Sequence, residues 1–526
     1  MKEKESFQEV RKSYQPRLPT LLKDIKNIAL IEQETPEVKE EIAPLFEHTK
    51  HQKILKFEKG KEMQRALCMG VVFSGGQAAG GHNVVLGIYE ALKTLHKENT
   101  LIGFLDGPNG LIEQKHTLLD EKTIDRYRNQ GGFDMIGSGR TKIETQEQLT
   151  KALNTVKALK LDGLVVIGGD DSNTNTAVLA EFFKKANQPT CVIGVPKTID
   201  GDLKSEYIET SFGFDSACKT YSELIGNIAR DCLSSKKYTH FIRLMGRSAS
   251  HIALECALQI QPNITFISEE VQRKGYSIDD LVNQLVSWME ARAKDNKHYG
   301  IVLIPEGIIE FIDEFKKLIE ELNELLVKQT KDVIQALSSN SQKVYHALPS
   351  DIQKQLLLDR DSHGNVRVSF IESEKVFIEL CKQRLKDKPE IKFSPQAHFF
   401  GYEGRACFPS NFDCDYCYAL GFMSTCLILH QKTGYICAIK HLKHEVHEWQ
   451  PFAVPIVSML HLEMRKGEEK PVIKKALVDL NDKPFLKYKE HQKEWMEQDC
   501  YLFPGPMQFF GDTLTHETPK SLDLST

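Results

Sequence analysis

The chain has 526 residues, which is too long for one ordinary domain and predicts several domain-sized pieces or two large ones. Hydrophobic residues make up 41% and charged residues 27%, a globular composition that excludes collagen-like, disordered and disulfide-scaffold proteins. With 68 Lys and Arg against 73 Asp and Glu, the net charge is −5, which gives no overall electrostatic reason to expect nucleic acid or an anionic membrane as a partner.

The cysteines and the apolar segments favour a cytoplasmic protein. The 12 cysteines are scattered without a regular disulfide framework. The C-x-x-C pair Cys414 and Cys417 has no second pair at metal-ligand spacing, so zinc or redox chemistry there is disfavoured. The N-terminus has no apolar core, and no stretch reaches the ~18 apolar residues of a membrane span. We therefore expect neither a membrane nor a nucleic-acid partner.

Residues 1–65 are charged and helix-friendly, which predicts an N-terminal helical extension that covers a core. Short apolar runs rich in Val and Ile follow, and such runs are typical of buried parallel strands. The runs are ALCMGVVF (66–73), TLIGFL (100–105), LDGLVVI (161–167), TCVIGV (190–195), THFIRLM (239–245), YGIVLI (299–304) and AHFFGY (397–402).

Helical patterns alternate with these runs, at 83–97, 172–185 and 277–294. Alternating strands and helices predict an α/β fold, here two lobes with mainly parallel sheets flanked by helices. The expected parts are a first lobe at 66–245, a second lobe at 246–430 with a helical insertion at about 306–392, and a mixed C-terminal segment at 431–526.

The first strand end with unusual chemistry is VVFSGGQAAGGHN (71–83), where Gly75 and Gly76 lie between a strand and a helix. Glycines permit positive φ and let backbone N–H groups approach a phosphate, with the helix N-terminus behind them. No G-x-G-x-x-G or G-K-[ST] is present, so Rossmann and Walker sites are poorly supported. The alternative is a tight strand–helix turn without a ligand.

The second strand end, VVIGGDDSNTN (165–175), places the adjacent acids Asp170 and Asp171 behind a Gly pair. A carboxylate at a strand end suits a Mg²⁺ ion that bridges phosphate oxygens. The alternative is an N-cap role for Asp171 or Ser172, which would explain one acid but not two.

The third strand end, VPKTIDGDLK (195–204), offers a cation at Lys197, a hydroxyl at Thr198 and carboxylates at Asp200 and Asp202. In phosphoryl transfer a carboxylate accepts the proton of the attacking hydroxyl, while cations neutralise developing charge. A Gly-containing β-turn with polar decoration is the alternative.

Further strand ends carry Arg247 in LMGRS, Glu306 in IPEG, and Tyr402 and Arg405 in FGYEGR, and Arg140 in IGSGRTKIE is another candidate cation. Arg suits bidentate phosphate binding, and a carboxylate suits sugar hydroxyls. Each residue alone fits a surface ion pair. Together they describe a pocket for a phosphorylated sugar facing a phosphate donor.

The motifs GGDDS, PKTIDGD, MGR, PEG and GYEGR occur in the same order as in the phosphofructokinases, and the resemblance runs from about residue 66 to 430. ATP-using members generally carry Gly where this chain has Asp171 and Lys197. In these two positions the chain resembles the pyrophosphate-dependent members of the long type. The two side chains fill the space of the nucleotide α-phosphate; Asp171 repels that phosphate, while Lys197 pairs with pyrophosphate.

The resemblance implies reversible, Mg²⁺-dependent transfer of phosphate from pyrophosphate to fructose 6-phosphate, giving fructose 1,6-bisphosphate and phosphate. It implies Asp200 as proton acceptor, Lys197, Asp171 and Arg140 as further catalytic groups, Gly75, Gly76 and Lys197 at pyrophosphate, and Asp170 as the metal ligand. The implied sugar-phosphate residues are Thr198, Ile199, Asp200, Lys237, Tyr238, Met245, Gly246, Arg247, Glu306, Tyr402, Glu403, Gly404 and Arg405. Lys237 and Tyr238 match a pair that reaches the neighbouring subunit's substrate, which implies at least a homodimer.

Alternative functions remain at this point. An ATP-dependent 6-phosphofructokinase would have the same fold, but Asp171 and Lys197 argue against it. A non-catalytic regulatory subunit of a pyrophosphate-dependent enzyme predicts loss of Asp170, Asp200 or Arg247, and all of these are present. A kinase of the NAD or diacylglycerol type shares the GGD strand end but does not explain TIDGD, MGR and PEG.

Overall fold

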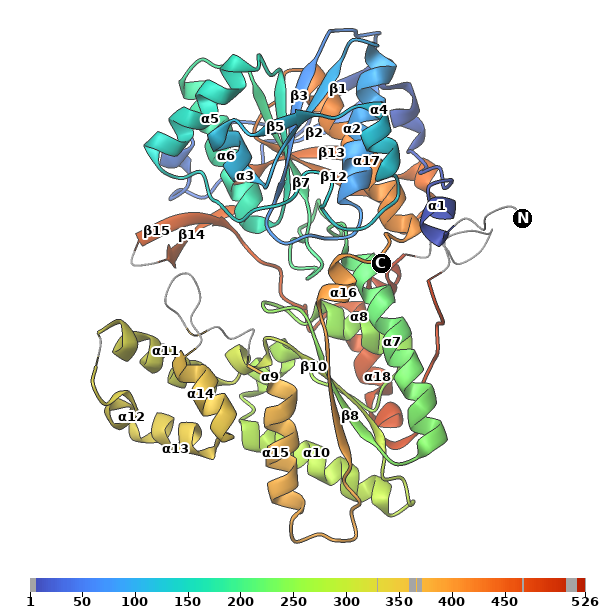
Figure 1. Cartoon of the computed structure of the whole chain (residues 1–526), viewed down its shortest axis with the longest axis vertical. Helices are drawn as coiled ribbons and strands as arrows, with labels where there is room; N and C mark the ends of the chain where they lie inside the picture. The colour runs from blue at the N-terminus through green and yellow to red at the C-terminus, as the bar shows by residue number, and fades with distance from the viewer. Residues whose placement is uncertain are drawn as a thin grey trace. The chain divides into compact units, whose positions relative to one another are not determined.

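A computed structural model describes residues 6–328, 330–358, 366, 371–465, 468–507 and 518–525. Small parts of the expected extension, insertion and C-terminal segment lie outside these ranges. The chain forms two compact units (Figure 1). Unit 1 comprises Met1–Ala217, Tyr402–Ala476 and Met507–Thr518, and unit 2 comprises Cys218–Gly401, Leu477–Pro506 and Pro519–Thr526.

Unit 1 is built on a nine-stranded sheet of order β1-β2-β13-β12-β7-β6-β3-β4-β5. The strands are β1 (Ile28–Glu32), β2 (Leu55–Lys59), β3 (Cys68–Ser74), β4 (Thr100–Phe104), β5 (His116–Leu118), β6 (Gly163–Gly168), β7 (Cys191–Pro196), β12 (Tyr435–Lys440) and β13 (Gln450–Pro455). The neighbours from β12 to β4 pair in parallel, and the outer strands pair antiparallel.

Helices cover both faces of this sheet, with α3, α5 and α6 on one side and α2 and α17 on the other (Figure 1). The helices of unit 1 are α1 (Phe7–Arg11), α2 (Gly81–Leu95), α3 (Pro108–Glu113), α4 (Glu121–Arg126), α5 (Gln146–Ala158), α6 (Asp170–Lys185), α16 (Tyr402–Arg405) and α17 (Asn411–Leu429). Successive side chains of a strand point to opposite faces of the sheet, so each face has its own core. On one face, Val72, Val166 and Val192 pack with α5 and α6.

Helix α17 is buried along its whole length and packs closely on α2. A Cβ atom at Gly87 would lie 2.3 Å from the Tyr418 carbonyl oxygen, and one at Gly421 would lie 2.4 Å from that of Val84. The absence of side chains at these glycines therefore lets the two backbones touch. The C-x-x-C pair lies in α17, where Cys414 and Cys417 are free and buried.

Unit 2 contains a four-stranded parallel sheet of order β11-β8-β10-β9. Its strands are β8 (Thr239–Leu244), β9 (Ile264–Thr265), β10 (Gly300–Pro305) and β11 (Pro395–Phe400). Its helices are α7 (Phe214–Ser235, which begins in unit 1), α8 (His251–Ile260), α9 (Ser268–Lys274), α10 (Ile278–Ala293), α11 (Asp313–Val327), α12 (Val333–Ala336), α13 (Ser339–Ala347), α14 (Ser350–Leu358), α15 (Ser373–Leu385), α18 (Lys483–Glu497) and α19 (Lys520–Leu524). Helices α11 to α15 fall within the predicted insertion.

Every apolar run that predicted a strand forms one, so the expected α/β class is confirmed. The N-terminal extension differs from the helical one expected. It has one five-residue helix, short 3-10 turns and the strands β1 and β2. In β2 the side chains of Leu55 and Phe57 are buried on alternate positions, and pairing with β13 adds the segment to the sheet.

The second lobe is also not the continuous run expected, because the chain returns to unit 1 at Tyr402. This return supplies α17, β12, β13 and a hairpin of β14 (Leu460–Arg465) and β15 (Glu468–Ile473).

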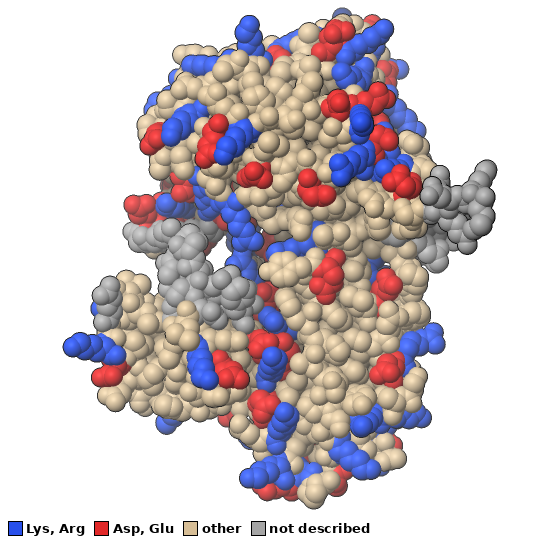
Figure 2. All heavy atoms as spheres, in the orientation of Figure 1, with Lys and Arg blue, Asp and Glu red and all other residues tan. Residues whose placement is uncertain are grey.

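On the face drawn in Figure 2, basic and acidic side chains are interspersed over the described surface. Within the described ranges, none of the helices is both long and apolar enough to cross a membrane.

Candidate active site

The strands β3, β6 and β7 end level with one another, because Ser74 pairs with Gly168 and Gly168 with Pro196. The polar sequences that follow these strands therefore start at one edge of the sheet, as expected for a ligand site at the carboxyl ends of parallel strands. Lys197 N donates a hydrogen bond to Gly168 O at 3.0 Å, which ties the third of these loops to the second.

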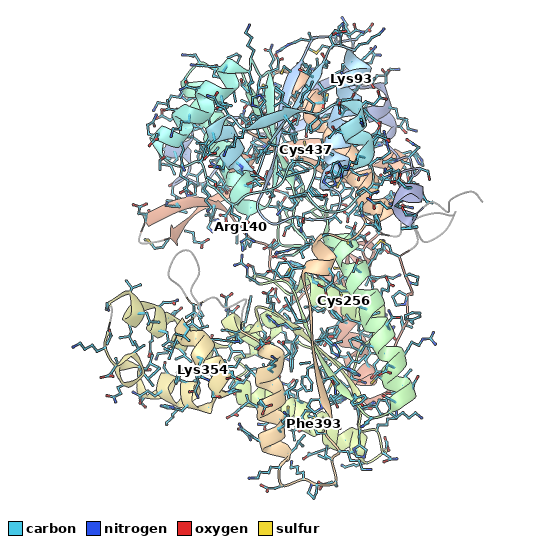
Figure 3. The ribbon with its side chains drawn as sticks, in the orientation of Figure 1. Lys93, Arg140, Cys256, Lys354, Phe393 and Cys437 are labelled. Carbon is cyan, nitrogen blue, oxygen red and sulfur yellow. The ribbon has the colours of Figure 1, made fainter. Side chains whose placement is uncertain are left out.

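The glycine loop after β3 is surrounded by cations. Gly75 has a φ of +88°, and a Cβ atom there would lie 3.7 Å from Lys197 Nζ. A Cβ atom at Gly76 would lie 3.6 Å from Arg405 Cζ and 3.8 Å from Arg140 Nη2. Figure 3 shows Arg140 at the margin of unit 1, whereas Cys437 lies in its interior. Three basic side chains from separate parts of the sequence therefore face this loop.

Lys197 is only 7% exposed. Burial lowers the pKa of its ammonium group to about 8, and the nearby Arg405 cation acts in the same direction. The carboxylates of Asp200, Asp170 and Asp202 act in the opposite direction. A bound polyanion would favour the charged form of Lys197, so this buried cation is suited to an anionic ligand.

Asp170 and Asp171 form the first turn of α6, where acidic side chains complement the helix dipole. The N-cap is Gly169, and no side chain caps the helix, so the N-cap interpretation of Asp171 or Ser172 is wrong. Lys142 Nζ lies 2.9 Å from Asp171 Oδ1.

The TIDGD turn holds its two acids in different surroundings. Asp200 is partly exposed, and its backbone N–H donates to Thr198 Oγ1 at 3.1 Å. Asp202 is 7% exposed, and burial, followed by the charge of Asp200, raises the pKa of its carboxyl group to about 7. Ile199 between them is buried. The turn therefore offers one accessible carboxylate beside one that is largely enclosed.

Sequence reasoning missed two lysines at this edge. Lys475 Nζ lies 3.8 Å from Asp170 Oδ2 and 3.8 Å from Asp202 Oδ2. Lys142, which pairs with Asp171, stands two residues after Arg140, so its position in IGSGRTKIE was the available signal. Lys475 follows the hairpin in a segment without a motif, and nothing in the sequence singles it out.

The carboxylates at this edge suit a Mg²⁺ ion that takes most of its ligands from water and substrate, rather than a metal ion held by protein side chains alone. Among the described residues there is no group of three or more His, Cys, Asp or Glu side chains arranged to hold a metal ion. Mg²⁺ usually keeps several waters and takes one or two carboxylates together with substrate phosphates. The side chain of Asp170, 26% exposed beside the glycine loops, offers such a ligand.

In unit 2, β8 and β10 run parallel and end level, with Leu244 opposite Pro305. The next residues are joined directly: Gly246 N donates to the buried Glu306 Oε2 at 3.1 Å, and Gly246 has a φ of +134°. Met245 is buried, whereas Arg247 is exposed. The predicted residues Met245, Gly246, Arg247 and Glu306 are thus brought together at one edge of the second sheet.

The other predicted residues lie in two short segments that are partly exposed. In α16, Arg405 Cζ lies 5.5 Å from the centre of the Tyr402 ring, Glu403 is exposed and Gly404 is buried. In unit 2, Lys237 Nζ lies 5.0 Å from the centre of the Tyr238 ring, just before β8. These residues precede or follow strands, as the motifs predicted.

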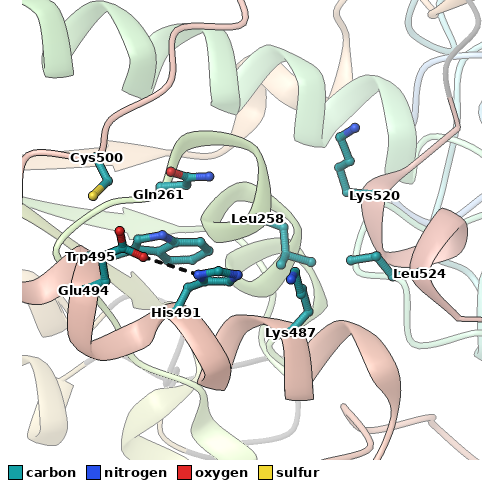
Figure 4. A pocket seen from close by; sticks show the side chains of 9 residues that line it. All are labelled: Leu258, Gln261, Lys487, His491, Glu494, Trp495, Cys500, Lys520 and Leu524. Carbon is teal, nitrogen blue, oxygen red and sulfur yellow. Dashed lines mark hydrogen bonds and ion pairs between the residues drawn. The ribbon is translucent and has the colours of Figure 1, made fainter.

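A separate cavity of about 310 Å³ lies within unit 2 (Figure 4). Its lining comes from α8, α18 and α19 and their flanking residues, and the rings of His491 and Trp495 stack with centroids 5.7 Å apart. None of the predicted site residues lines it, so it is not part of the chemistry described above.

The family model described as phosphofructokinase matches residues 68–353, which is more than half of the chain. The chain belongs to the phosphofructokinase family. The resemblance seen in the sequence is therefore confirmed. Solved members of the family share the fold: the crystal structure of a pyrophosphate-dependent phosphofructokinase from Nitrosospira multiformis matches with a TM-score of 0.57 and 16% identity, over 86% of this chain and 96% of that one.

Relatives within the family match over almost the whole length. The pyrophosphate–fructose 6-phosphate 1-phosphotransferase of Porphyromonas gingivalis is 47% identical over 97% of this chain and 96% of its own. The enzyme of that name from Entamoeba histolytica is 47% identical over 97% of both chains. Subunit beta 2 of the Arabidopsis thaliana enzyme is 49% identical over 85% of this chain and 80% of its own.

Proposed function

We propose that this chain is a pyrophosphate–fructose 6-phosphate 1-phosphotransferase that works reversibly with Mg²⁺. The observation that carries the proposal is the position of Lys197: its buried ammonium group lies 3.7 Å from a Cβ atom built at Gly75 in the glycine loop. The names of relatives that match this chain over nearly its whole length support the same activity.

In the donor site, the backbone N–H of Gly76 approaches the pyrophosphate, and Lys197 binds it as a cation. Gly75, whose own N–H donates to Gly139 O at 2.8 Å, supplies the positive φ and the space that the ligand needs beside Lys197. Arg140 stabilises the charge of the transferring phosphoryl group. Asp171 disfavours a nucleotide, because its carboxylate stands where an α-phosphate would bring further negative charge.

Asp170 would hold the Mg²⁺ ion, which when bound neutralises charge on the phosphate oxygens. Asp200 accepts the proton of the fructose 6-phosphate 1-hydroxyl as that oxygen attacks the nearer phosphorus of pyrophosphate. The P–O bond to the bridging oxygen breaks, and inorganic phosphate leaves with the bonding electrons. One phosphoanhydride is exchanged for one phosphate ester, and the reverse reaction uses the same groups.

In the sugar site, the 6-phosphate is bound by Arg247 and Arg405, and Glu306 accepts hydrogen bonds from sugar hydroxyls. The remaining residues of this site are Thr198, Ile199, Met245, Gly246, Tyr402, Glu403 and Gly404. Lys237 and Tyr238 serve the substrate of a neighbouring subunit, which makes the enzyme a homodimer or larger. We place it in the cytoplasm.

The test is formation of fructose 1,6-bisphosphate from fructose 6-phosphate and Mg²⁺, with pyrophosphate and ATP in parallel reactions. We expect turnover with pyrophosphate alone and its loss in Asp200→Ala. Turnover with ATP alone would contradict the donor assignment and favour the ATP-dependent alternative. Absence of turnover with both donors would instead favour the regulatory-subunit alternative. Lys197→Gly, measured alongside, reports whether this lysine controls the choice of donor.

A further inference from the structure

The hairpin β14–β15 ends at a fixed position beside the acids of the donor site. Ile473 N, in the last residue of β15, donates to Thr174 Oγ1 of α6 at 3.3 Å. Three residues later, Ala476 N donates to the backbone oxygen of Asp202 at 2.8 Å. Lys475 lies between these anchors, so its backbone is held between α6 and the TIDGD turn.

The side chain of Lys475 extends from this backbone to two carboxylates. Its Nζ lies 3.8 Å from Asp170 Oδ2 and from Asp202 Oδ2, and the side chain is 34% exposed. Asp202 itself is enclosed, with 9% of its side chain exposed, so water screens this charge poorly. Lys475 is therefore placed to offset negative charge where an anionic donor has to approach.

The neighbouring cations are committed to other positions. Lys142 pairs with Asp171, and Lys197 faces the glycine loop at Gly75. Without Lys475, the carboxylate of Asp170, together with Asp202 where it is ionised, would repel the donor across the same edge. A site that uses carboxylates for metal binding and proton transfer repels a polyanionic donor, and a cation beside these carboxylates reduces that repulsion.

We propose that Lys475 is a donor-positioning residue: its ammonium group offsets the carboxylates of Asp202 and Asp170 and thereby admits pyrophosphate. The inference rests on the proposed function, since it assumes that pyrophosphate is the donor. It gives the hairpin β14–β15 a role in the site, because this hairpin fixes where Lys475 stands.

The test uses the full-length enzyme and two measurements: the dissociation constant of pyrophosphate with Mg²⁺ in the absence of fructose 6-phosphate, by calorimetry, and the KM of each substrate. We expect Lys475→Gln to raise the dissociation constant and the KM of pyrophosphate about tenfold or more, and to change the KM of fructose 6-phosphate less than about twofold. Lys475→Arg should retain binding. The matched control is Lys474→Gln at the adjacent exposed lysine, which should bind as the wild type does.

A double variant separates charge compensation from a structural role. If Lys475 acts by offsetting Asp202, then Asp202→Asn combined with Lys475→Gln restores much of the affinity that Lys475→Gln loses. If Lys475→Gln does not fold, Asp202→Asn alone carries the test and should bind pyrophosphate more tightly than the wild type.

Pyrophosphate binding that is unchanged in Lys475→Gln, or a double variant no better than Lys475→Gln, would overturn the proposal. So would unchanged affinity in Asp202→Asn. A wild-type protein that binds no pyrophosphate would instead defeat the proposed function, so the two failures are distinguishable.

Discussion

Lys142 and Asp171 form an ion pair, with Nζ and Oδ1 2.9 Å apart. Both side chains are partly exposed, at 38% and 47%. Asp171, the acid proposed to select the donor, is therefore held in place by Lys142, which lies in the same loop as Arg140. This pairing offsets part of the charge of Asp171 and fixes where its carboxylate lies.

The ion pair predicts a moderate effect of Lys142→Ala. Because the pair is exposed, its loss should cost about 0.5–1 kcal/mol, and kcat/KM for pyrophosphate should fall about two- to fivefold as Asp171 becomes uncompensated. Steady-state kinetics with varied pyrophosphate measure this. Adding Asp171→Asn should remove most of the loss, and an equal loss in the double variant would contradict the explanation.

The pKa of Lys197 predicts how donor binding depends on pH. Burial lowers this pKa to about 8, so the cation is present below that pH and is lost as the pH rises through it. Pyrophosphate affinity should therefore weaken above about pH 8. Pyrophosphate also titrates, so the comparison is with Lys197→Arg, whose guanidinium stays charged. If the two proteins share one pH profile, Lys197 is not the titrating group.

Gly76→Ala should weaken donor binding without destabilising the fold. The added Cβ would make ordinary contacts, 3.6 Å from Arg405 Cζ, but would occupy space next to the cations. We expect the KM of pyrophosphate to rise about tenfold, equivalent to about 1.4 kcal/mol, with an unchanged melting temperature. For contrast, Gly107 has a φ of +82° and its Cβ would lie 2.2 Å from Gly139 N, so Gly107→Ala should lower the melting temperature.

The N-terminal segment contributes to stability through Arg17. Its Nε donates to Asp415 Oδ2 at 2.9 Å, and Tyr14 Oη donates to Oδ1 at 2.9 Å, while the Asp415 side chain is fully buried. Arg17→Ala should cost about 2–3 kcal/mol, somewhat less than a fully buried pair, because Arg17 is 38% exposed. Denaturant unfolding measures the loss.

The pH dependence of this loss has a definite sign. Burial already raises the pKa of Asp415 to about 6, and removing Arg17 raises it further. A protonated Asp415 needs no cation, so the deficit of Arg17→Ala should shrink as the pH falls through that raised pKa. Asp415→Asn should rescue Arg17→Ala at neutral pH. Failure of this rescue would mean that Arg17 stabilises the protein by packing alone.

Much of unit 1 could be predicted from the sequence because its central strands are buried on both faces. The runs LDGLVVI and TCVIGV are apolar at every residue that enters β6 or β7, and the polar residues that follow them mark the edge where Lys197 and Asp170 lie. The strand β12 was not predicted, although Ile436 and Ile439 are buried. It is followed by an antiparallel strand rather than a helix, so the alternation that identified the other strands is missing.

Long-range pairing explains the other omissions. The helix-friendly extension forms β1 and β2 because β13, roughly 400 residues later, offers an edge, and such tertiary pairing overrides local propensity. Lys475 is brought near Asp170 by the hydrogen bond from Ile473 N to Thr174 Oγ1, two residues that are 299 positions apart in the sequence. Local patterns carry no information about either contact.

The late return of the chain to unit 1 has a consequence for synthesis on the ribosome. From Cys218 to Lys440, the last residue of β12, is roughly 220 residues, which at about 5–20 residues per second take roughly 10–45 s to translate. During that interval the sheet lacks β12, so β7 has an unpaired edge, and the surface of α2 on which α17 packs stays exposed until α17 has been made. The unfinished sheet therefore exposes a strand edge in the nascent chain, and the edge that carries Arg405 and Lys475 is complete only when nine-tenths of the chain has been made.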